Sequence, residues 1–445
     1  MADLPLLRRF EGNAIFAYRP RAPITAAQFL QHVRQVAPQL PERAHVFNLC
    51  GDRYHFVVGL GAALIRRQIT LLPPNETAGF LAQLETVYPG AYCLSDRADT
   101  GRPPRTVMFP DLDGGTATCP DLPEIPESQI AAIVFTSGST GEPLAHAKTW
   151  GTLVGSGSAE CARLGLDDKP GAAVLGTVPP QHMNGLESTV IMPMQGGLAM
   201  HHARPFYPAD ICAQLAALPR PRVLVTTPVH LRALLADGAH LPPVDLIVCA
   251  TAMLTPQLAA AAEARFAAPL REIYGCTEAG QIATRRTLES PEWQTLPGMT
   301  LRQDEKGTWV RGGHVDTETL LNDMIEMRGR GRFLLHGRNA DMVNIAGKRT
   351  SLATLNYHLN SIPGVQDGVF VMPEEGGDVV PRLAAFVVAP GVSHDVVMRI
   401  LRERIDAAFL PRPLAFVDAL PRNATGKLPR AALDAMLREL ASREA

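Results

Sequence analysis

The stretch Thr136-Ser-Gly-Ser-Thr-Gly-Glu-Pro143 follows directly after the apolar run Ala131–Phe135. The run has the length and composition of a buried β-strand, whereas the four hydroxyls and two glycines after it are typical of a loop. Glycines let a backbone approach its ligand closely, and successive N–H groups together with hydroxyls can surround a polyphosphate. The segment predicts a phosphate-binding loop at the end of a strand, with a plain Ser/Gly turn as the alternative.

The loop does not have the Walker A pattern. That pattern places Gly-Lys-Ser/Thr after four variable residues, but the fifth residue after Gly138 is Pro143. The other candidate, Thr425-Gly426-Lys427, has Pro421 where the first glycine would stand. A P-loop NTPase is therefore disfavoured.

Short apolar strands and helices alternate on both sides of this loop, which indicates βαβ units and a parallel sheet. Strands are predicted at 45–49, 69–72, 131–135, 172–178, 223–227, 246–250 and 271–274, and helices at 26–40 (after Thr25 as N-cap), 54–66, 209–218, 228–236 and 256–266. Residues 99–128 read as loop or edge structure. Residues 350–445 change character and predict helix 351–360, strands 368–372 and 383–388, helix 395–409, strand 414–417 and a helix from Arg430. We predict an α/β fold with a large N-terminal domain (1–338) of parallel-rich sheets and flanking helices, and a small, mobile C-terminal α+β domain (339–445), with a hinge near 337–341.

Composition narrows the function classes. The 445 residues carry 42 Lys and Arg against 44 Asp and Glu, a net charge of −2, which argues against a nucleic-acid binder. The seven cysteines include no CxxC pair, so structural zinc and a disulfide framework are disfavoured and a cytoplasmic location is expected. No signal-peptide h-region and no apolar run near ~18 residues is seen, so we expect no integral membrane association. Only five of the 42 basic residues are Lys, so each is a candidate for a position where Arg cannot substitute. Lys169 and Lys306 lie in segments typical of surface turns, which leaves Lys148, Lys348 and Lys427 as the candidates.

The phosphate loop and four later segments, taken in order, resemble the adenylate-forming superfamily of acyl-CoA synthetases, peptide-synthetase adenylation domains and luciferases. The later segments are Pro180-Gln-His182-Met-Asn-Gly185, Tyr274-Gly-Cys-Thr277-Glu278, Asp323 with Gly337-Arg338, and Pro421-Arg-Asn-Ala-Thr-Gly426-Lys427-Leu-Pro-Arg430. Any one motif is weak, but the ordered set spans roughly residues 45–430.

The resemblance implies ATP as substrate and Mg²⁺ as cofactor. Joining a carboxylate to the α-phosphate brings two anions together, so fixed positive charge and positioning should supply the catalysis. The resemblance implies that Lys427 is the catalytic cation and that Thr277 contacts the α-phosphate. It also implies that Glu278 helps to hold Mg²⁺ and that Asp323 accepts hydrogen bonds from the ribose hydroxyls. The other nucleotide-binding candidates are Thr136, Ser137, Gly138, Ser139, Thr140, Gly141, Lys148, Thr251, Ala252, Tyr274, Gly275 and Arg338.

The resemblance also implies which residues bind the carboxylic acid and the acceptor thiol. His182 matches the residue that borders the acyl pocket, with a satisfied core histidine as the alternative. The stretch 249–254 aligns with a small-residue segment that packs on adenine and on the pocket floor, with a buried strand end as the alternative. The pocket candidates are His182, Asn184, Gly185, Ala250, Met253 and Cys276, the last as a spacer without thiol chemistry. Gly347 matches the glycine near the pantetheine tunnel.

Two positions depart from the family pattern. The hinge residue, commonly Asp, would fall on Ala340, with Asp341 next to it. Many relatives have Lys after the loop proline, where this chain has Leu144, and Lys148 follows four residues later. Lys148 either replaces the missing charge or is an exposed strand lysine.

The short chain, together with the segments NLCGDRY, LLPPN and FTSGSTGEP, most resembles the small stand-alone hydroxybenzoate–acyl-carrier-protein ligases of aryl-polyene pigment pathways. This predicts an aryl-adenylate whose acyl group passes to CoA or a carrier-protein thiol. That thiol is supplied in trans, because Gly376-Gly377-Asp378 is followed by Val379 and not by the carrier serine. The alternatives are a medium-chain acyl-CoA or acyl-carrier synthetase, an amino-acid adenylation domain, and a non-catalytic nucleotide-binding partner protein.

Overall fold

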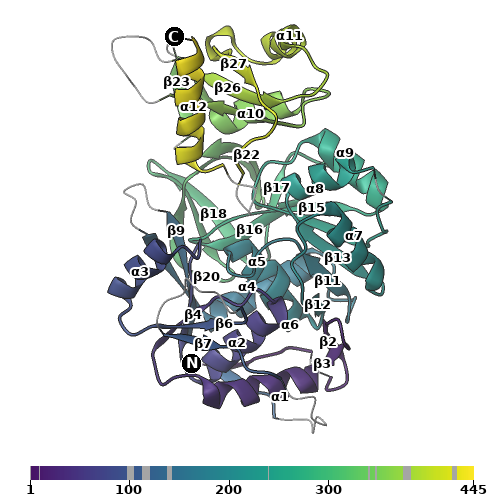
Figure 1. The fold of residues 1–445 in the computed structure, drawn as a ribbon, viewed down its shortest axis with the longest axis vertical. Coiled ribbons are helices and arrows are strands. Elements are labelled where there is room, and N and C mark those ends of the chain that lie inside the picture. The colour runs from purple at the N-terminus through teal and green to yellow at the C-terminus, as the bar shows by residue number, and fades with distance from the viewer. Residues whose placement is uncertain are drawn as a thin grey trace.

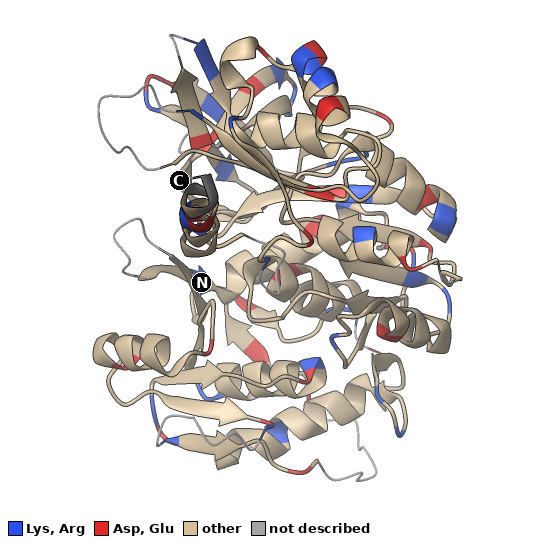
Figure 2. Ribbon diagram, turned by 45° about the horizontal axis from the view of Figure 1, so that its top comes forward, with Lys and Arg blue, Asp and Glu red and all other residues tan. Residues whose placement is uncertain are grey.

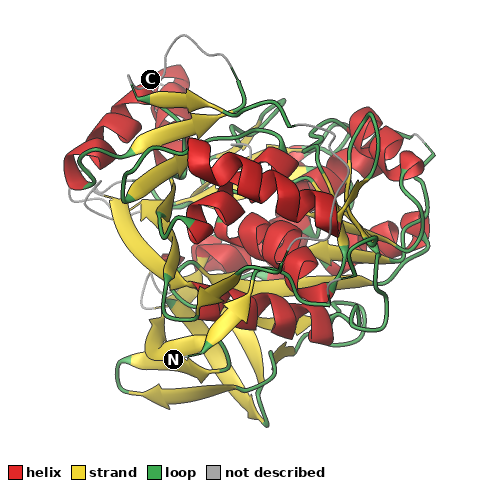
Figure 3. Cartoon of the chain, turned by 90° about the horizontal axis from the view of Figure 1, so that it is seen from below, coloured by secondary structure: helices red, strands yellow, loops and turns green. Residues whose placement is uncertain are grey.

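The computed structural model describes residues 2–9, 11–97, 105–112, 121–137, 143–238, 240–338, 341–345, 348–373, 382–422 and 428–444. Two large sheets and the helices between them form the lower part of the molecule in Figure 1, and the elements after residue 341 form the upper part. Seen from below, helices run through the centre of the molecule with strands around them (Figure 3). Acidic and basic residues are interspersed along the visible ribbon (Figure 2).

In the described part of the chain, the first sheet has six strands. Their order is β10 (Pro143–Thr149), β9 (Ile130–Ser137), β5 (Ile69–Leu72), β4 (His45–Asn48), β6 (Tyr92–Ser95) and β7 (Thr106–Met108). All neighbours are parallel except the β9–β10 hairpin. The inner strands are almost wholly apolar because helices cover both faces of a parallel sheet. The prediction of a βαβ arrangement here is confirmed.

The second sheet joins eleven strands of the described chain. Their order is β21 (Asp323–Gly329), β22 (Arg332–Arg338), β17 (Trp293–Thr295), β16 (Gly280–Arg285), β15 (Leu270–Cys276), β14 (Leu246–Cys249), β13 (Arg222–Thr226), β11 (Ala173–Gly176), β12 (Ala199–His201), β2 (Ile15–Tyr18) and β3 (Ile24–Thr25). The stretch from β15 to β2 is parallel, and the pairs at both ends are antiparallel. The carboxyl ends of these six adjacent parallel strands therefore point to one edge.

The helices of the lower part pack mainly between and beside these sheets. They are α1 (Ala26–Val36), α2 (Arg53–Ile65), α3 (Ala78–Val87), α4 (Trp150–Arg163), α5 (Met183–Leu186) with a π-helical turn (Glu187–Ile191), α6 (Met192–Gly196), α7 (Pro208–Ala217), α8 (Pro228–Ala236) and α9 (Pro256–Phe266). One core contains residues of α1, α2, α4 and α6 and of strands from both sheets. The predicted N-cap Thr25 forms a capping box with Gln28, an interaction worth about 1 kcal/mol.

Two smaller sheets complete the lower part. One is an antiparallel meander of β18 (Met299–Asp304), β19 (Gly307–Gly312) and β20 (Val315–Leu321), and the other pairs β1 (Asp3–Pro5) with β8 (Glu124–Pro126). The sequence reading did not identify the meander, although Thr308 and Val310 are buried on alternate positions of β19 as a half-buried strand requires. Residues 105–108 and 124–126 lie at sheet edges, as predicted for this region.

The elements after residue 341 have sheets and cores of their own. They are β23 (Met342–Ile345) with β24 (Lys348–Ser351), β25 (Asp367–Val371) with β26 (Ala384–Val388) and β27 (Leu414–Phe416), and α10 (Leu352–Asn360), α11 (His394–Arg404) and α12 (Arg430–Glu444). A separate apolar core runs from Val343 to Leu414. This agrees with the predicted α+β unit, while the boundary at 338/339 remains a prediction.

The predicted helix 395–409 is wrong in its extent. Helix α11 ends at Arg404, and Ile405 is extended. The Asp406 side chain then accepts a hydrogen bond from the N–H of Ala408 and caps a short 3₁₀ turn, Ala407–Phe409. Aspartate commonly interrupts helices in this way, because its carboxylate competes for backbone donors.

Candidate active site

Three of the predicted segments meet at the carboxyl edge of the eleven-stranded sheet. Strand β11 leads into Pro180–Gly185, β14 into Thr251, and β15 into Thr277 and Glu278. In open α/β sheets, ligands bind outside the carboxyl ends of the parallel strands. Segments up to 100 residues apart in the sequence are therefore brought to one place.

The phosphate-loop hairpin belongs to the other large sheet. Thr136 lies near the end of β9, and its Oγ1 is 3.0 Å from Nε2 of His146 on β10. Residues 138–142 lie outside the described residues, as does the side chain of Ser137, so Gly138, Ser139, Thr140 and Gly141 remain predictions.

The His182 segment is held by backbone contacts that tolerate little change. A Cβ on Gly185 would lie 1.9 Å from the carbonyl oxygen of Pro179, so this position requires glycine. His182 is the N-cap residue of α5, in extended conformation. The side chain of Gln181 donates to the Cys50 carbonyl oxygen at 2.8 Å. In the described part of the chain, the buried amide atoms of Asn184 have no hydrogen-bond partner, which leaves that side chain available to a ligand.

The Tyr274 motif forms the tight hairpin between β15 and β16. The register shifts at Tyr274/Gly275, and a Cβ on Gly275 would lie 2.4 Å from the Gly280 carbonyl oxygen. Thr277 and Glu278 therefore occupy a turn whose backbone path depends on glycine. The Tyr274 hydroxyl donates to Oδ2 of Asp323 at 2.8 Å, which joins two predicted nucleotide residues 49 positions apart.

Cys276 lies in the same hairpin, and burial raises the pKa of its thiol to about 12. The thiol is therefore protonated at neutral pH, in keeping with the predicted absence of thiol chemistry.

The small-residue segment after β14 bends sharply. Thr251 has a positive φ of 80°, a conformation that costs a non-glycine residue of order 1–3 kcal/mol and clusters at ligand sites. Ala250 is buried, and Thr251, Ala252 and Met253 are exposed. The alternative of a wholly buried strand end is therefore wrong for 251–253.

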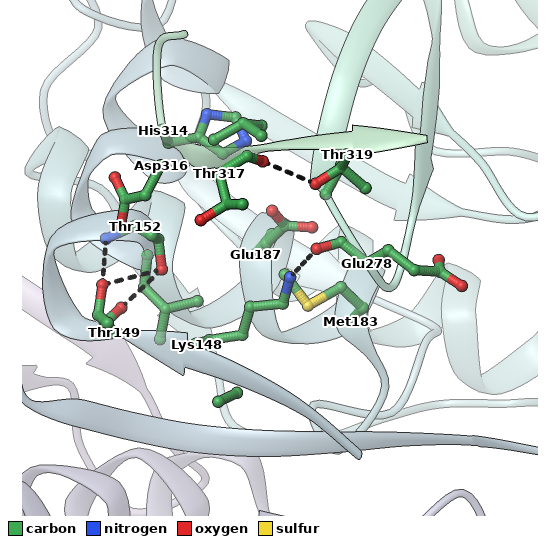
Figure 4. Close-up of a pocket in the computed structure, with 14 residues that line it drawn as sticks. Lys148, Thr149, Thr152, Met183, Glu187, Glu278, His314, Asp316, Thr317 and Thr319 are labelled. Atoms are coloured by element: carbon green, nitrogen blue, oxygen red, sulfur yellow. Dashed lines mark hydrogen bonds between the residues drawn. The ribbon is translucent and has the colours of Figure 1, made fainter. Parts of the chain in front are cut away.

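Lys148 is not the exposed strand lysine that the sequence left open. Only 6% of the residue is exposed, and its ammonium donates to the main-chain oxygen of Glu278 at 2.7 Å. It borders a cavity of about 240 Å³ together with Met183, Glu187, Glu278 and His314 (Figure 4).

Glu187 and His314 were missed by the sequence reading. Glu187 is the only Asp, Glu, Lys or Arg between Lys169 and Arg204, and a single charge in such an uncharged stretch is a signal for a buried functional group. Burial raises its pKa to about 7, against the opposing effects of the Ser156 hydrogen bond and the Lys148 charge. His314 lies in a glycine-containing turn and carries no comparable signal.

Glu278 is suited to a hard cation. Lys148 binds its main-chain oxygen, and its carboxylate extends away from that ammonium (Figure 4). The described residues contain no cluster of three or more His, Cys, Asp or Glu that could hold a metal by themselves. A single carboxylate fits Mg²⁺, which is usually held by one or two carboxylates plus phosphates and water.

Three further predicted site residues cannot be placed in full. Lys427 and Gly347 lie outside the described residues, as does the side chain of Arg338, so their roles remain predictions. Ala340 of the hinge region also lies outside them. Among the residues that are described, no helix combines the length and apolar character needed to cross a bilayer.

Comparison with known sequences identifies the family. Residues 22–305 match the model described as AMP-binding enzyme. A 4-coumarate–CoA ligase of Rhodobacter capsulatus is 30% identical over 305 residues, which cover 67% of this chain and 75% of that protein. A 3-hydroxybenzoate–CoA/4-hydroxybenzoate–CoA ligase of Thauera aromatica is 25% identical over 387 residues, or 77% and 73% of the two chains.

Solved structures confirm the fold. The o-succinylbenzoate CoA synthetase of Bacillus subtilis, in complex with its acyl-adenylate intermediate, superposes with a TM-score of 0.78 at 19% identity and covers 97% of this chain and 98% of its own. An anthranilate CoA ligase in complex with anthranoyl-AMP gives 0.77 at 16% identity, with 99% of both chains covered. The motifs at the sheet edge, the matched model and the shared fold agree. The chain belongs to the AMP-binding enzyme family, the adenylate-forming superfamily, and is an AMP-forming acid–thiol ligase.

Proposed function

We propose that this enzyme activates a hydroxybenzoate-like aromatic acid with ATP and transfers the aryl group to the thiol of CoA or of an acyl-carrier-protein phosphopantetheine. The observation that carries the proposal is the convergence of His182, Thr277 and Glu278 at one sheet edge, next to a cavity large enough for a ring. The two curated relatives described above support an aromatic acid, since their names specify coumarate and hydroxybenzoates.

In the first half-reaction, a carboxylate oxygen of the acid forms a bond to the α-phosphorus of ATP. The bond from that phosphorus to the bridging oxygen breaks, and pyrophosphate leaves. Thr136 and the loop after it would hold the departing phosphates, and Lys427 would bridge the carboxylate and α-phosphate oxygens as a compact cation. Asp323, oriented by the Tyr274 hydroxyl, would accept from the ribose hydroxyls, and Arg338 would face the nucleotide.

Glu278 would hold Mg²⁺, which when bound neutralises phosphate charge. Thr277, in the same turn, would contact the α-phosphate.

In the second half-reaction, the thiol sulfur forms a bond to the acyl carbon, the carbon–oxygen bond to AMP breaks, and AMP leaves. We propose that residues 339–445 move as a domain between the two steps, so that Lys427 withdraws and the thiol enters past Gly347. The large sheet ends at Arg338, and β23 begins a separate sheet at Met342, which supports a boundary in this region.

The test is ATP–pyrophosphate exchange over a panel of benzoates, cinnamates, C8–C12 fatty acids and amino acids. We expect exchange with hydroxybenzoates, and we expect Lys427→Ala to lower it by at least about 10²-fold, the effect of removing one transition-state charge contact. Lys306→Met, a change of an exposed lysine, is the control and should leave exchange intact. Exchange with fatty acids or amino acids alone would contradict an aromatic acid as the substrate. A Lys427→Ala enzyme with unchanged exchange would contradict the catalytic role of Lys427.

The acceptor is settled by a second assay with the preferred acid. CoA and phosphopantetheinylated carrier proteins are offered separately, and thioester formation is followed by mass. A higher kcat/KM with a carrier protein would support the resemblance to the hydroxybenzoate–acyl-carrier-protein ligases. A higher kcat/KM with CoA would indicate an aryl-CoA ligase instead.

A further inference from the structure

The cavity beside Lys148 has mixed walls, in which Thr149, Thr152, Asp316, Thr317 and Thr319 lie among the apolar and buried polar side chains (Figure 4). Its volume of about 240 Å³ exceeds the roughly 150 Å³ of an engineered apolar cavity that binds benzene. Leu153, Met183, Ala279 and Val315 supply apolar surface, and Lys148, Glu187 and His314 supply buried polar groups. Met183 follows His182 in the chain, and Ala279 follows Glu278. Residues of two predicted active-site motifs, or their immediate neighbours, therefore line the cavity.

The two charged groups of this cavity are not paired with each other. In the described part of the chain, Lys148 and Glu187 attract each other electrostatically but make no direct ion pair. The Lys148 ammonium makes one hydrogen bond there, to the Glu278 main chain. Both hydrogen bonds that reach Glu187 there, from Ser156 Oγ at 2.5 Å and from the Gln281 N–H at 3.2 Å, end on Oε1. An ammonium with spare donors and a carboxylate with a spare oxygen therefore border one space, although each is almost fully buried. Such groups are costly to bury unless a partner completes them.

His314 adds a third incomplete group. It is 6% exposed, and within the described chain neither ring nitrogen has a hydrogen-bond partner. Burial and then the charge of Lys148 lower its pKa to about 4, against the opposing effect of the nearby main chain of Gln281 and Ala279, whose contacts fall short of hydrogen-bond geometry. At neutral pH the ring therefore offers one donor and one acceptor.

A glycine keeps the space between these polar groups open. Gly280 has φ +78°, and a Cβ there would lie 2.7 Å from Oε1 of Glu187, 3.4 Å from Nε2 of His314 and 3.5 Å from Cε of Met183. Three side chains from different elements thus converge on a position without a side chain, two residues after Glu278. The space belongs to the same hairpin that presents Thr277 and Glu278.

We propose that Lys148, Glu187 and His314 form the subsite that binds the ring hydroxyl of the aromatic acid and so select hydroxylated over unsubstituted rings. A phenolic hydroxyl both donates and accepts, so it can donate to Glu187 and accept from Lys148 at the same time. An amine in place of the hydroxyl would supply only donors. A methyl group or a hydrogen there would leave Lys148 and Glu187 without a hydrogen-bond partner from the substrate. A hydroxyl in the meta or para position points away from the carboxylate, as this placement requires, and an ortho hydroxyl does not. The inference rests on the proposed function and assigns Lys148 to the acid rather than to the phosphates.

The test compares kcat/KM in ATP–pyrophosphate exchange for 3- and 4-hydroxybenzoate with that for benzoate, in wild type and in Lys148→Met, Glu187→Gln and the matched control Lys306→Met. The quantity measured is the ratio of hydroxybenzoate to benzoate. A group that serves the nucleotide affects both acids alike and leaves this ratio unchanged. We expect wild type to favour the better hydroxybenzoate at least tenfold, since sites built to bind a hydroxyl reject analogues that lack it. Both subsite variants should lower the ratio at least about tenfold, and the control should stay within about twofold of wild type.

Binding of the acid by calorimetry, in the presence of a non-hydrolysable ATP analogue, supplies a readout for any variant with too little exchange. Glu187→Gln keeps shape and volume, so it reports on the subsite even if Lys148→Met folds poorly. Unchanged ratios in both variants, or a wild type that does not distinguish benzoate from the hydroxybenzoates, would overturn the inference while leaving aryl activation standing. A wild type that activates only fatty or amino acids would overturn the proposed function itself.

Discussion

Among the residues that the structure describes, two buried side chains are cationic, Arg53 and Lys148, and their surroundings differ. Arg53, at the start of α2, is fully buried and uses all five N–H donors, on Thr189 Oγ1 and on the carbonyl oxygens of Gly176, Val178, His201 and Ala203. Lys148 is nearly as buried but makes one hydrogen bond, to Glu278, and borders a cavity. A buried cation whose N–H donors are all hydrogen-bonded stabilises the fold, whereas a buried cation with unused donors beside a cavity indicates a ligand site.

The position of Arg53 explains what it holds. Its helix packs with the six-stranded sheet, whereas its carbonyl acceptors lie at the ends of β11 and β12 of the eleven-stranded sheet or directly after them. Two of these acceptors lie just before Pro179, so Arg53 also fixes the approach to the His182 segment. The side chain acts on the site through the backbone and does not touch the reacting groups.

The largest effect on stability is expected for Arg53→Met. The change leaves four buried carbonyl oxygens without their donor, and an orphaned polar group costs about 1–3 kcal/mol, so we expect a loss of at least about 4 kcal/mol. Lys148→Met removes one hydrogen bond and one costly buried charge and should cost at most about 2 kcal/mol. Urea unfolding midpoints followed by circular dichroism measure both. Similar losses for the two variants would contradict the distinction between a fully hydrogen-bonded cation and one with unused donors.

A smaller effect is expected for Asp52, the neighbour of Arg53. Asp52 caps α2 and accepts a hydrogen bond from Nδ1 of His202 at 2.7 Å, with Arg19 nearby. Burial alone would raise its pKa, but the His202 hydrogen bond and the charges of His55, His202 and Arg19 lower it to about 2. A carboxyl with a lowered pKa stabilises the fold above its ordinary pKa of 3.8, and this stabilisation is lost as pH falls through about 2.

Asp52→Asn keeps a good N-cap residue, so it isolates the charge. At pH 7 we expect it to lower the free energy of unfolding by about 2 kcal/mol, and we expect the difference from wild type to shrink as pH falls below 4. Urea unfolding at pH 7, 5 and 3 tests this, with exposed Asp395→Asn as the control. A difference that stays constant across this range would show that the contribution of Asp52 does not depend on its charge.

The smallest effect is expected for the hydrogen bond between Tyr274 and Asp323. The Tyr274 hydroxyl holds one oxygen of Asp323, which the proposal assigns to the ribose. Tyr274→Phe removes a hydrogen bond worth about 1 kcal/mol, so KM for ATP should rise roughly fivefold with little change in KM for the acid. Exchange kinetics with each substrate varied in turn provide the measurement, and Tyr207→Phe, on an exposed tyrosine, provides the control. Equal rises in both KM values would indicate general loosening of the hairpin instead of a role at the nucleotide.

The fold was largely predictable because its signals are local. Apolar runs of four to five residues define the parallel strands, and the turn or cap residues that bound them mark β5 and α8 to the residue. The end of α11 was missed because the competing contact of Asp406 is a side-chain choice that periodicity does not show. The meander β18–β20 was missed because its strands are half exposed and mix polar with apolar residues, so they contain no continuous apolar run.

The sequence by itself determined the family, through motifs whose residues must be of given types at given spacings. Gly185 and Gly275 belong to these motifs, and the tertiary structure supplies the reason for them, since any side chain there would collide with the backbone. The partners of Lys148 were decided only by the tertiary structure. Glu187, Gly280 and His314 lie 39 to 166 residues beyond it in the chain, and nothing in a linear sequence states which charge is left incomplete once the sheets and helices have packed. Motif residues are recognisable because the chemistry fixes their identity, whereas specificity depends on distances across a cavity that folding alone sets.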